Sequence, residues 1–320
     1  MRSKSTEKKI TNATAMKISK NDDDKLLQEI SIEEKYNKII EWFQIEFKKN
    51  KEKILVALSG GVDSAVVAMV AKHALGKENV LAITANYQTL SNEELDTAVM
   101  IARELEINHK IIEYNELENP EFIKNDDSRC FHCRNELANN LLNLSNKENF
   151  KLIVDGSNTD DLNDYRPGMI ALHEKGVKSP LIETGCNKKE IRRLAEINNL
   201  SVYDKPSNAC LASRISRNIE ITVPKLKRIE KCESMIKKIF DIKQVRVRDH
   251  GDLARIEVEK EELVKLFDIN KINQIEIPFK EHGFKYITID IEGYRKSGSN
   301  ISNKIENLNK KRMDVNNDIK

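Results

Sequence analysis

The chain has 320 residues, enough for one large domain or two modest ones that each bury a core. Its 54 basic and 52 acidic residues nearly cancel, which argues against general coating of nucleic acid and leaves only a local basic patch for RNA. No run approaches the roughly 20 apolar residues that cross a bilayer, and residues 1–24 contain no apolar signal segment. We therefore expect a cytoplasmic protein without membrane contact.

The ends of the chain differ in composition from its middle. Residues 1–30 and 297–320 are rich in Lys, Asn, Asp and Ser, with too few apolar side chains to offset the entropy of ordering, so both are predicted to be flexible tails. Between them we expect a first domain over residues 31–215 and a smaller one over residues 216–296.

The first domain alternates helices and strands. An apolar stripe predicts a helix over residues 31–47. The predicted strands are residues 54–58, 80–84, 109–113 and 151–155. The predicted helices between them are residues 63–75, 91–105 and 135–144. This alternation predicts an α/β fold, a parallel sheet with helices on both faces and ligands at the carboxyl ends of its strands.

The order of elements changes beyond residue 216. The pattern predicts a long helix at residues 224–240 and two strands at residues 244–248 and 253–258. Two helical stretches and a final strand at residues 286–291 follow. That order is typical of a small α+β domain.

The strand at residues 54–58 leads directly into Ser59-Gly60-Gly61-Val62-Asp63-Ser64. Two adjacent glycines let the backbone approach an anion, and the helix that follows offers unpaired N–H donors. The segment lacks the Gly-Lys-Ser/Thr ending of the Walker loop and the G-x-G-x-x-G spacing of dinucleotide sites. A phosphate-binding loop is the favoured interpretation, and a plain strand-to-helix turn is the alternative.

Five cysteines, an odd and scattered set, are unlike a secreted disulfide framework. Cys130 and Cys133 form a lone C-x-x-C, which suits redox chemistry, zinc or a cluster, or two incidental buried thiols. Cys210 lies in the polar segment 205–214 and is the candidate third ligand, with Arg214 as the nearby charge that favours its thiolate. Three cysteines on a four-iron cluster leave one iron open for sulfide or substrate, which suits sulfur transfer.

Two further loops and one strand carry candidate binding residues. Gly156 lies in the loop at residues 155–161, and Asn163 and Arg166 lie in the polar loop that follows. Arg246 and Arg248 alternate with valines, so both would project from one strand face and suit a phosphate-bearing substrate. Solvated loops and a solvated strand face are the alternatives.

The S-G-G-V-D-S segment resembles the PP-loop superfamily, whose members cleave ATP between the α and β phosphates. The resemblance implies that ATP binds with Mg²⁺ and that Asn86, at the next strand end, meets the adenosine. It also implies the phosphate ligands, which are Ser59, Gly60, Gly61, Asp63 and Ser64.

The longer motifs narrow the resemblance. D-G-S-N, N-D-Y-R-P-G, P-S-N-A-C-L-A-S-R and V-R-V-R-D-H-G-D-L-A-R-I-E together resemble the LarE family, the sulfur transferases of nickel-pincer nucleotide biosynthesis, over residues 51–293. The resemblance implies that ATP adenylates a carboxylate of pyridinium-3,5-biscarboxylic acid mononucleotide and that sulfur then displaces AMP. It also implies substrate contacts from Asn163, Arg166, Ser213, Arg214, Arg246 and Arg248.

The position of Cys210 matches the sulfur-bearing cysteine of that family. Some members sacrifice this cysteine, whereas others carry two more cysteines and hold a [4Fe-4S] cluster. R-C-F-H-C is similar to the second kind, which implies a cluster on Cys130, Cys133 and Cys210 and a supply of sulfide or another sulfur donor.

Two rival functions share parts of this pattern. A PP-loop tRNA thiolase also has C-x-x-C and a third cysteine, although the sequence has no concentrated basic surface for RNA. An ammonia-dependent synthetase of the NAD or GMP synthase kind would use the same ATP loop. The sequence leaves the oligomeric state open.

Overall fold

The computed structural model describes residues 31–49, 53–163 and 167–294, which form two compact units. The first unit comprises the described residues up to Ser213 together with Arg217–Leu226, and the second comprises Arg214–Ser216 and the described residues from Lys227 onward. The predicted tails, residues 1–30 and 297–320, lie outside the described residues. None of the described helices is both long enough and apolar enough to cross a bilayer.

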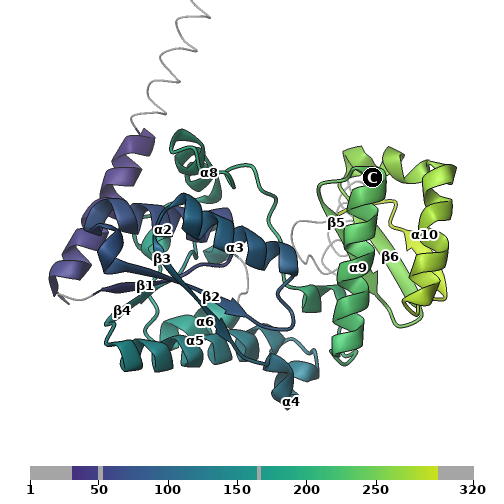
Figure 1. The fold of residues 1–320 in the computed structure, drawn as a ribbon, viewed down its shortest axis with the longest axis horizontal. Coiled ribbons are helices and arrows are strands. Elements are labelled where there is room, and N and C mark those ends of the chain that lie inside the picture. Colours follow the sequence, from purple (N-terminus) through teal and green to yellow (C-terminus); the bar gives the residue numbers. More distant parts are fainter. Residues whose placement is uncertain (1–30, 50–52, 164–166, 295–320) are drawn as a thin grey trace, which may run out of the picture. The chain divides into compact units, whose positions relative to one another are not determined.

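The first unit is built on a parallel sheet of four strands, which confirms the predicted α/β fold (Figure 1). The strands are β1 (Ile54–Ala57), β2 (Val80–Asn86), β3 (Asn108–Glu113) and β4 (Leu152–Val154), in the spatial order β3-β2-β1-β4. β1 is central and pairs with both β2 and β4, while β3 forms one edge. Because all four strands are parallel, the loops that follow them meet at the carboxyl end of the sheet, where open α/β folds bind ligands.

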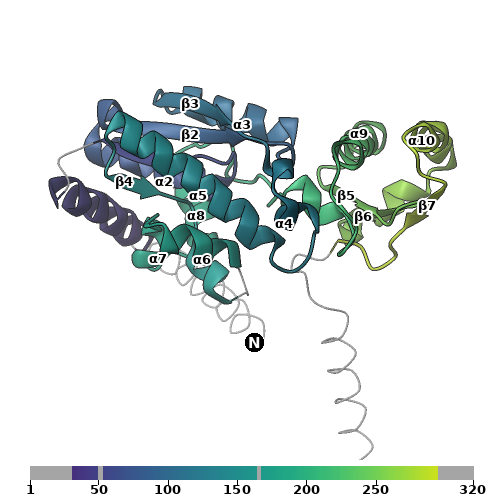
Figure 2. The same ribbon diagram turned by 90° about the horizontal axis from the view of Figure 1, so that it is seen from below.

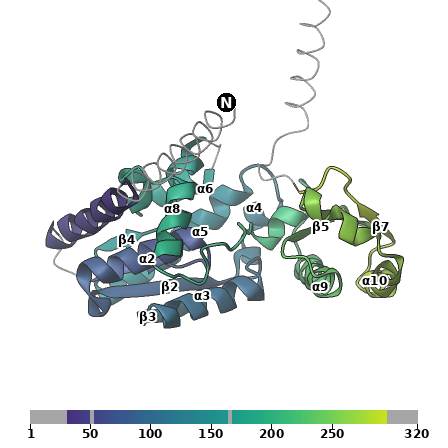
Figure 3. The ribbon, with the colours of Figure 1, turned by 90° about the horizontal axis from the view of Figure 1, so that it is seen from above.

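Helices cover both faces of this sheet because side chains of the buried strands alternate between two apolar cores. Ile54 and Val56 of β1 pack in one core with α2 (Val62–Leu75), α3 (Asn92–Glu104) and α8 (Lys188–Ile197). The helix at residues 31–49 joins the same core, and Figure 3 shows α2, α3 and α8 on this side.

The other face is covered by α5 (Arg129–Glu148) and α6 (Pro167–Glu174), which Figure 2 shows in front of the sheet. Leu55 of β1 and Ile83 of β2 pack there against Leu141. The predicted helix at residues 135–144 is thus longer than expected and begins at Arg129. Cys130 and Cys133 consequently lie in the first two turns of α5.

Short elements connect the layers of the first unit. They are η1 (Lys77–Asn79), η2 (Glu116–Glu118), α4 (Pro120–Ile123), η3 (Thr159–Asn163), α7 (Pro180–Glu183) and η4 (Leu211–Arg214).

The second unit contains most of α9 (Val223–Phe240), then β5 (Val245–Asp249), β6 (Leu253–Val258), η5 (Lys260–Phe267), α10 (Ile269–Glu281) and β7 (Tyr286–Ile289). Its sheet has the order β5-β6-β7, with β5 antiparallel and β7 parallel to β6. A separate apolar core that includes Phe240, Val247 and Phe279 holds it together.

Candidate active site

The loop between β1 and α2 has the backbone geometry of an anion cradle. Gly61 is the N-cap of α2 with extended backbone and makes no side-chain cap, so the first N–H groups of the helix point to the loop without a capping acceptor. Gly60 has a φ of +80°, a conformation that favours glycine. A negatively charged phosphate suits this helix start because the helix dipole and the open N–H groups both attract it.

Two serine side chains hold the loop in this shape. Ser64 Oγ accepts a hydrogen bond from the Ser59 N–H at 3.1 Å and donates to the Gly61 carbonyl at 3.0 Å. The hydroxyls of Ser59 and Ser64 lie 3.2 Å apart. These contacts close the loop on itself.

Two glycines are required by close packing around the loop. A Cβ at Gly60 would lie 2.5 Å from the Glu94 carbonyl oxygen of α3. A Cβ at Gly156, in the loop after β4, would lie 2.6 Å from the Ser64 backbone nitrogen. The predicted residue Gly156 therefore packs directly on the start of α2, and the loops after β1 and β4 form one surface.

Asp63 supplies a carboxylate beside the phosphate cradle. It forms an ion pair with Lys188, from the first turn of α8. Its other oxygen, Oδ1, is buried and has no hydrogen-bond partner among the described residues. Burial raises the pKa of Asp63, and the positive charge of Lys188 opposes that rise. An orphaned buried carboxylate oxygen beside a phosphate cradle fits Mg²⁺, which prefers oxygen ligands.

The segment that leads to Cys210 is fastened to the phosphate loop. Lys205 Nζ donates to the Gly60 carbonyl at 3.1 Å and pairs with Glu94 at 3.0 Å. Asn208 Nδ2 donates to Glu94 Oε1 at 3.0 Å. Because Glu94 also lies against Gly60, the phosphate loop and the cysteine-bearing segment share one set of polar contacts.

The three candidate cysteines are brought to the same end of the first unit. Burial raises the pKa of Cys133 to about 12, and the charges of nearby Cys210 and Cys130 add to the rise. None of the five cysteines forms a disulfide bond. No three His, Cys, Asp or Glu side chains of the described residues are arranged to hold a single metal ion.

Arg129 ties the cysteine-bearing elements together. Its buried guanidinium donates from Nη1 to Asn125 Oδ1 at 2.7 Å and to the Ala212 carbonyl at 3.1 Å. From Nη2 it approaches Cys130 Sγ at 3.6 Å. Arg129 also interacts electrostatically with Cys210, so it places positive charge among thiols from both α5 and the segment before η4.

A second cation, Arg134, lies next to Cys133 on α5. It makes no hydrogen bond or ion pair to another described residue, and it interacts electrostatically with Tyr87, Cys133 and Tyr114. The two tyrosine rings stack with centroids 5.5 Å apart, and the buried Tyr114 hydroxyl has no hydrogen-bond partner among the described residues. Burial raises the pKa of both phenols, so they remain neutral donors.

The cysteine-bearing segment is also anchored on the loop after β2. The Leu211 N–H donates to the Thr89 carbonyl at 2.9 Å. Glu116, fully buried, holds that loop by accepting from the N–H groups of Thr89 at 2.7 Å and Gln88 at 3.0 Å. Backbone contacts therefore join the loop after β2 to the residue next to Cys210.

The structure says less about the predicted contacts of Asn86, Asn163 and Arg166. Asn86 ends β2 and its amide donates to Glu113 Oε1 at 3.2 Å, so a role with adenosine stays a prediction. Asn163 ends η3, but its side chain and the whole of Arg166 lie outside the described residues.

Arg214 has a different partner from the one predicted. It belongs to the second unit, is 1% exposed and donates from Nε to Glu233 Oε1 at 2.9 Å. Arg129 and Arg134 also carry charge near the Cys210 thiol, and the expected effect of Arg214 on that thiol stays a prediction. Ser213, its neighbour, belongs to the first unit.

The paired strand arginines are also engaged within the second unit. Arg246 is buried, donates to the Val245 carbonyl at 2.8 Å and lies 5.1 Å from the Tyr294 ring centroid. Arg248 binds Glu257 Oε2 at 2.8 Å. Arg246 is therefore not solvated, whereas the Arg248 side chain is partly exposed, and their contact with a substrate phosphate remains a prediction.

Several site residues escaped the sequence analysis. Lys188, Lys205 and Glu94 are distant from the phosphate loop along the chain, and Arg129 and Arg134 look like ordinary helix surface charges. One signal was present: Asn187 and Glu190 form a capping box that starts α8 and orients Lys188 in its first turn.

The fold and this loop are those of a PP-loop domain, and the PP-loop family is one of ATP pyrophosphatases that bind ATP with Mg²⁺. The family model described as NAD synthase matches residues 35–152. An NH(3)-dependent NAD(+) synthetase of Fusobacterium nucleatum is 34% identical over 42% of this chain and 54% of its own length.

Other relatives match both units. Uncharacterized protein slr1717 of Synechocystis is 39% identical over 78% of this chain and 92% of its own length. Uncharacterized protein MJ0830 of Methanocaldococcus jannaschii is 34% identical over 77% of this chain and 92% of its own length. The pyridinium-3,5-bisthiocarboxylic acid mononucleotide synthase of Lactiplantibacillus plantarum is 29% identical over 79% of this chain and 90% of its own length. The chain belongs to the family of slr1717 and MJ0830, with an NAD synthase-like PP-loop domain.

Proposed function

We propose that the protein is an ATP-dependent sulfur transferase that converts a carboxylate of pyridinium-3,5-biscarboxylic acid mononucleotide into a thiocarboxylate. The observation that carries the proposal is the contact between the two halves of the site: Lys205 and Asn208, in the segment that ends at Cys210, hold the phosphate loop through Gly60 and Glu94. The likeness to the bisthiocarboxylic mononucleotide synthase over both units supports the choice of substrate.

The first step is adenylation. A substrate carboxylate oxygen attacks the α-phosphorus of ATP, and pyrophosphate leaves. The open N–H groups at the start of α2 and the hydroxyls of Ser59 and Ser64 stabilise the charge on the departing phosphates. Asp63 would hold Mg²⁺ through its orphaned Oδ1, and Lys188 is the cation that balances the carboxylate before the metal binds.

The second step forms the carbon–sulfur bond. A carboxylate is a poor electrophile, whereas the acyl adenylate has AMP as a good leaving group. A hydrosulfide or other sulfur nucleophile attacks the acyl carbon, the carbon–oxygen bond to AMP breaks, and the nucleophile's proton is released. Arg129 and Arg134 place two positive charges beside the cysteines, where they would attract an anionic sulfur nucleophile.

Cys130, Cys133 and Cys210 are the residues that would hold a [4Fe-4S] cluster. The fit rests on donor chemistry: three thiols from two segments lie within electrostatic range of one another and of two arginines that offset thiolate charge. Such a cluster, when bound, supplies an iron without a protein ligand, on which a sulfur donor can be activated.

The test is a substrate-dependent assay under anaerobic conditions. Full-length protein with ATP, Mg²⁺, sulfide and the biscarboxylic mononucleotide should release AMP and pyrophosphate, and the product should gain the mass of sulfur in place of oxygen. AMP release that requires tRNA in place of the mononucleotide would overturn the proposal in favour of a tRNA thiolase.

Iron and labile sulfide content tests the cysteines separately. Cys130→Ser, Cys133→Ser and Cys210→Ser should each lower both contents. Cys186→Ser and Cys232→Ser are matched controls because both thiols are fully buried in apolar cores. A reconstituted wild type without iron would overturn the cluster assignment.

An ammonia-dependent synthetase is the second candidate, because the NAD synthase model matches the ATP-binding part of the chain. Ammonia offered in place of sulfide, with nicotinic acid adenine dinucleotide as the acceptor, should then support AMP release.

A further inference from the structure

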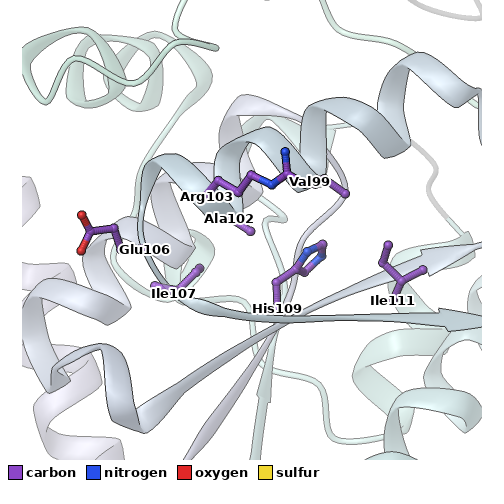
Figure 4. Close-up of a pocket in the computed structure, with 7 residues that line it drawn as sticks. All are labelled: Val99, Ala102, Arg103, Glu106, Ile107, His109 and Ile111. Carbon is purple, nitrogen blue, oxygen red and sulfur yellow. The ribbon is translucent and has the colours of Figure 1, made fainter.

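A series of hydrogen bonds connects a groove beside the edge strand β3 to the entrance of the phosphate loop. The groove lies between α3 and β3 and has a volume of about 400 Å³. Figure 4 shows the His109 ring standing between Ile107 and Ile111 and facing α3. The ring also reaches inward to β2, where its Nε2 lies 2.8 Å from Thr84 Oγ1.

The direction of each hydrogen bond in this chain is determined by chemistry. Thr84 Oγ1 lies 2.8 Å from the Leu58 carbonyl oxygen, which only accepts, so the single hydroxyl proton of Thr84 points to Leu58. His109 must then donate from Nε2 to Thr84. Burial lowers the pKa of His109, which favours the neutral ring with its proton on Nε2.

Leu58 occupies the point where β1 leaves the sheet. The paired register of β1 and β2 ends at Ala57 and Ile83, and the Leu58 N–H still donates to the Ile83 carbonyl at 2.8 Å. Among the described residues, no backbone N–H donates to the Leu58 carbonyl. The Thr84 hydroxyl, 1% exposed, takes that place, and a buried carbonyl without it would lose its partner.

The Leu58 carbonyl and the Ser59 N–H belong to one planar peptide group. Its carbonyl is held by Thr84, and its N–H is held by Ser64 Oγ at 3.1 Å. The same Ser64 hydroxyl donates to the Gly61 carbonyl. The orientation of this single peptide therefore sets the direction in which the chain enters the phosphate loop.

We propose that Thr84 and His109 are positioning residues for ATP: they hold the Leu58–Ser59 peptide in the orientation that the phosphate-binding conformation of the loop requires. Neither side chain contacts the loop itself, and neither is part of the proposed sulfur chemistry. The inference rests on ATP binding at the PP-loop and not on the identity of the acceptor substrate.

The test measures the dissociation constant of Mg-ATP by calorimetry, on the full chain and without any acceptor. Thr84→Val keeps the shape of the side chain and removes the hydroxyl, and it should raise the dissociation constant by about 3- to 10-fold, the value of one lost hydrogen bond. Thr84→Ser keeps the hydroxyl and should remain within about twofold of wild type.

The histidine is tested by the same logic. Gln offers an amide N–H near the position of Nε2, so His109→Gln should retain much of the affinity for ATP, whereas His109→Leu should lose as much as Thr84→Val. Ile107→Val is the control for packing, because Ile107 lines the same groove and is 7% exposed but takes no part in the chain. It should lower thermal stability without changing ATP affinity.

Two results would overturn the inference. One is wild-type ATP affinity in Thr84→Val, and the other is an equal loss of affinity in Ile107→Val, which would indicate a general packing effect. A wild-type protein that binds no ATP would overturn both this inference and the proposed function, whereas the first two results leave the proposed function intact.

Discussion

The two units of this protein use their charged residues in opposite ways. In the first unit, the site leaves groups open at the sheet edge: the start of α2 has no side-chain cap, and Asp63 Oδ1 has no described partner. In the second unit, buried charges satisfy one another, as in the pairs Arg214 with Glu233 and Arg228 with Asp249. The open groups of the first unit are available to a ligand, whereas the buried charges of the second unit pair with one another and stabilise its fold.

This contrast bears on how a substrate phosphate would be recognised. Arg248 is paired with Glu257, so a phosphate that binds it must compete with a carboxylate that is already in place. At the phosphate loop, the start of α2 has no side-chain cap among the described residues. We therefore expect ATP to bind the first unit independently of the state of the second.

The largest expected effect is on the stability of the second unit. Glu233→Ala removes the carboxylate that contacts the buried guanidinium of Arg214 and the Val247 N–H, and it should cost about 3–5 kcal/mol of unfolding free energy. Trp42 is the single tryptophan and lies in the first unit, so its fluorescence reports that unit alone.

Urea denaturation of this variant should therefore show an early transition by circular dichroism and an unchanged midpoint by Trp42 fluorescence. A fluorescence midpoint that moves as far as the circular dichroism midpoint would mean that the two units unfold together, and the comparison would fail.

The next largest effect is on ATP binding in the first unit. Gly60→Ala places a side chain at φ +80° and 2.5 Å from the Glu94 carbonyl, so it should weaken Mg-ATP binding by about 10- to 100-fold. Gly176→Ala is the matched control, because Gly176 has the same φ of +80° and nothing within 4 Å of its Cβ position. Gly176→Ala should lower stability and leave ATP affinity unchanged. Equal losses of ATP affinity in the two variants would show that close packing around Gly60 is not the cause.

A smaller effect concerns the pH dependence of stability. The folded-state pKa values of His73, His109 and His250 are lowered by burial, so below the unfolded value near 6.5 the unfolded chain takes up protons that the folded chain does not. Stability should therefore fall as pH falls through the window below about 6.5. His109→Gln should show a shallower slope by Trp42 fluorescence, since Gln does not titrate; an unchanged slope would contradict the burial of His109.

The smallest effect is expected at the surface of the second unit. Lys285 pairs with Asp252 at 2.7 Å, but both side chains are exposed and solvent weakens the interaction. Lys285→Ala should produce no measurable change in the circular dichroism midpoint. A shift comparable to that of Glu233→Ala would show that burial is not what separates the two pairs.

Much of the fold follows from local patterns. The alternation of apolar strands and helices predicts all four strands of the first sheet within a few residues, and the strand before Ser59 with two glycines after it predicts the phosphate loop. Helix ends were less predictable, because the polar first turn of α5 at Arg129 resembles a loop until tertiary contacts bury it.

By itself, the sequence determined which reactive groups are present: a glycine-rich strand-to-helix turn that suits phosphates, and three cysteines in two polar segments. Only the tertiary structure decided which charges act together. Arg214 is close to Cys210 along the chain yet pairs with Glu233, while Arg129 reaches the segment after Cys210 from α5. The physical reason is that helical and strand periodicity depend on neighbouring residues, whereas a contact such as Thr84 with Leu58 exists only once the sheet has brought β1 and β2 side by side.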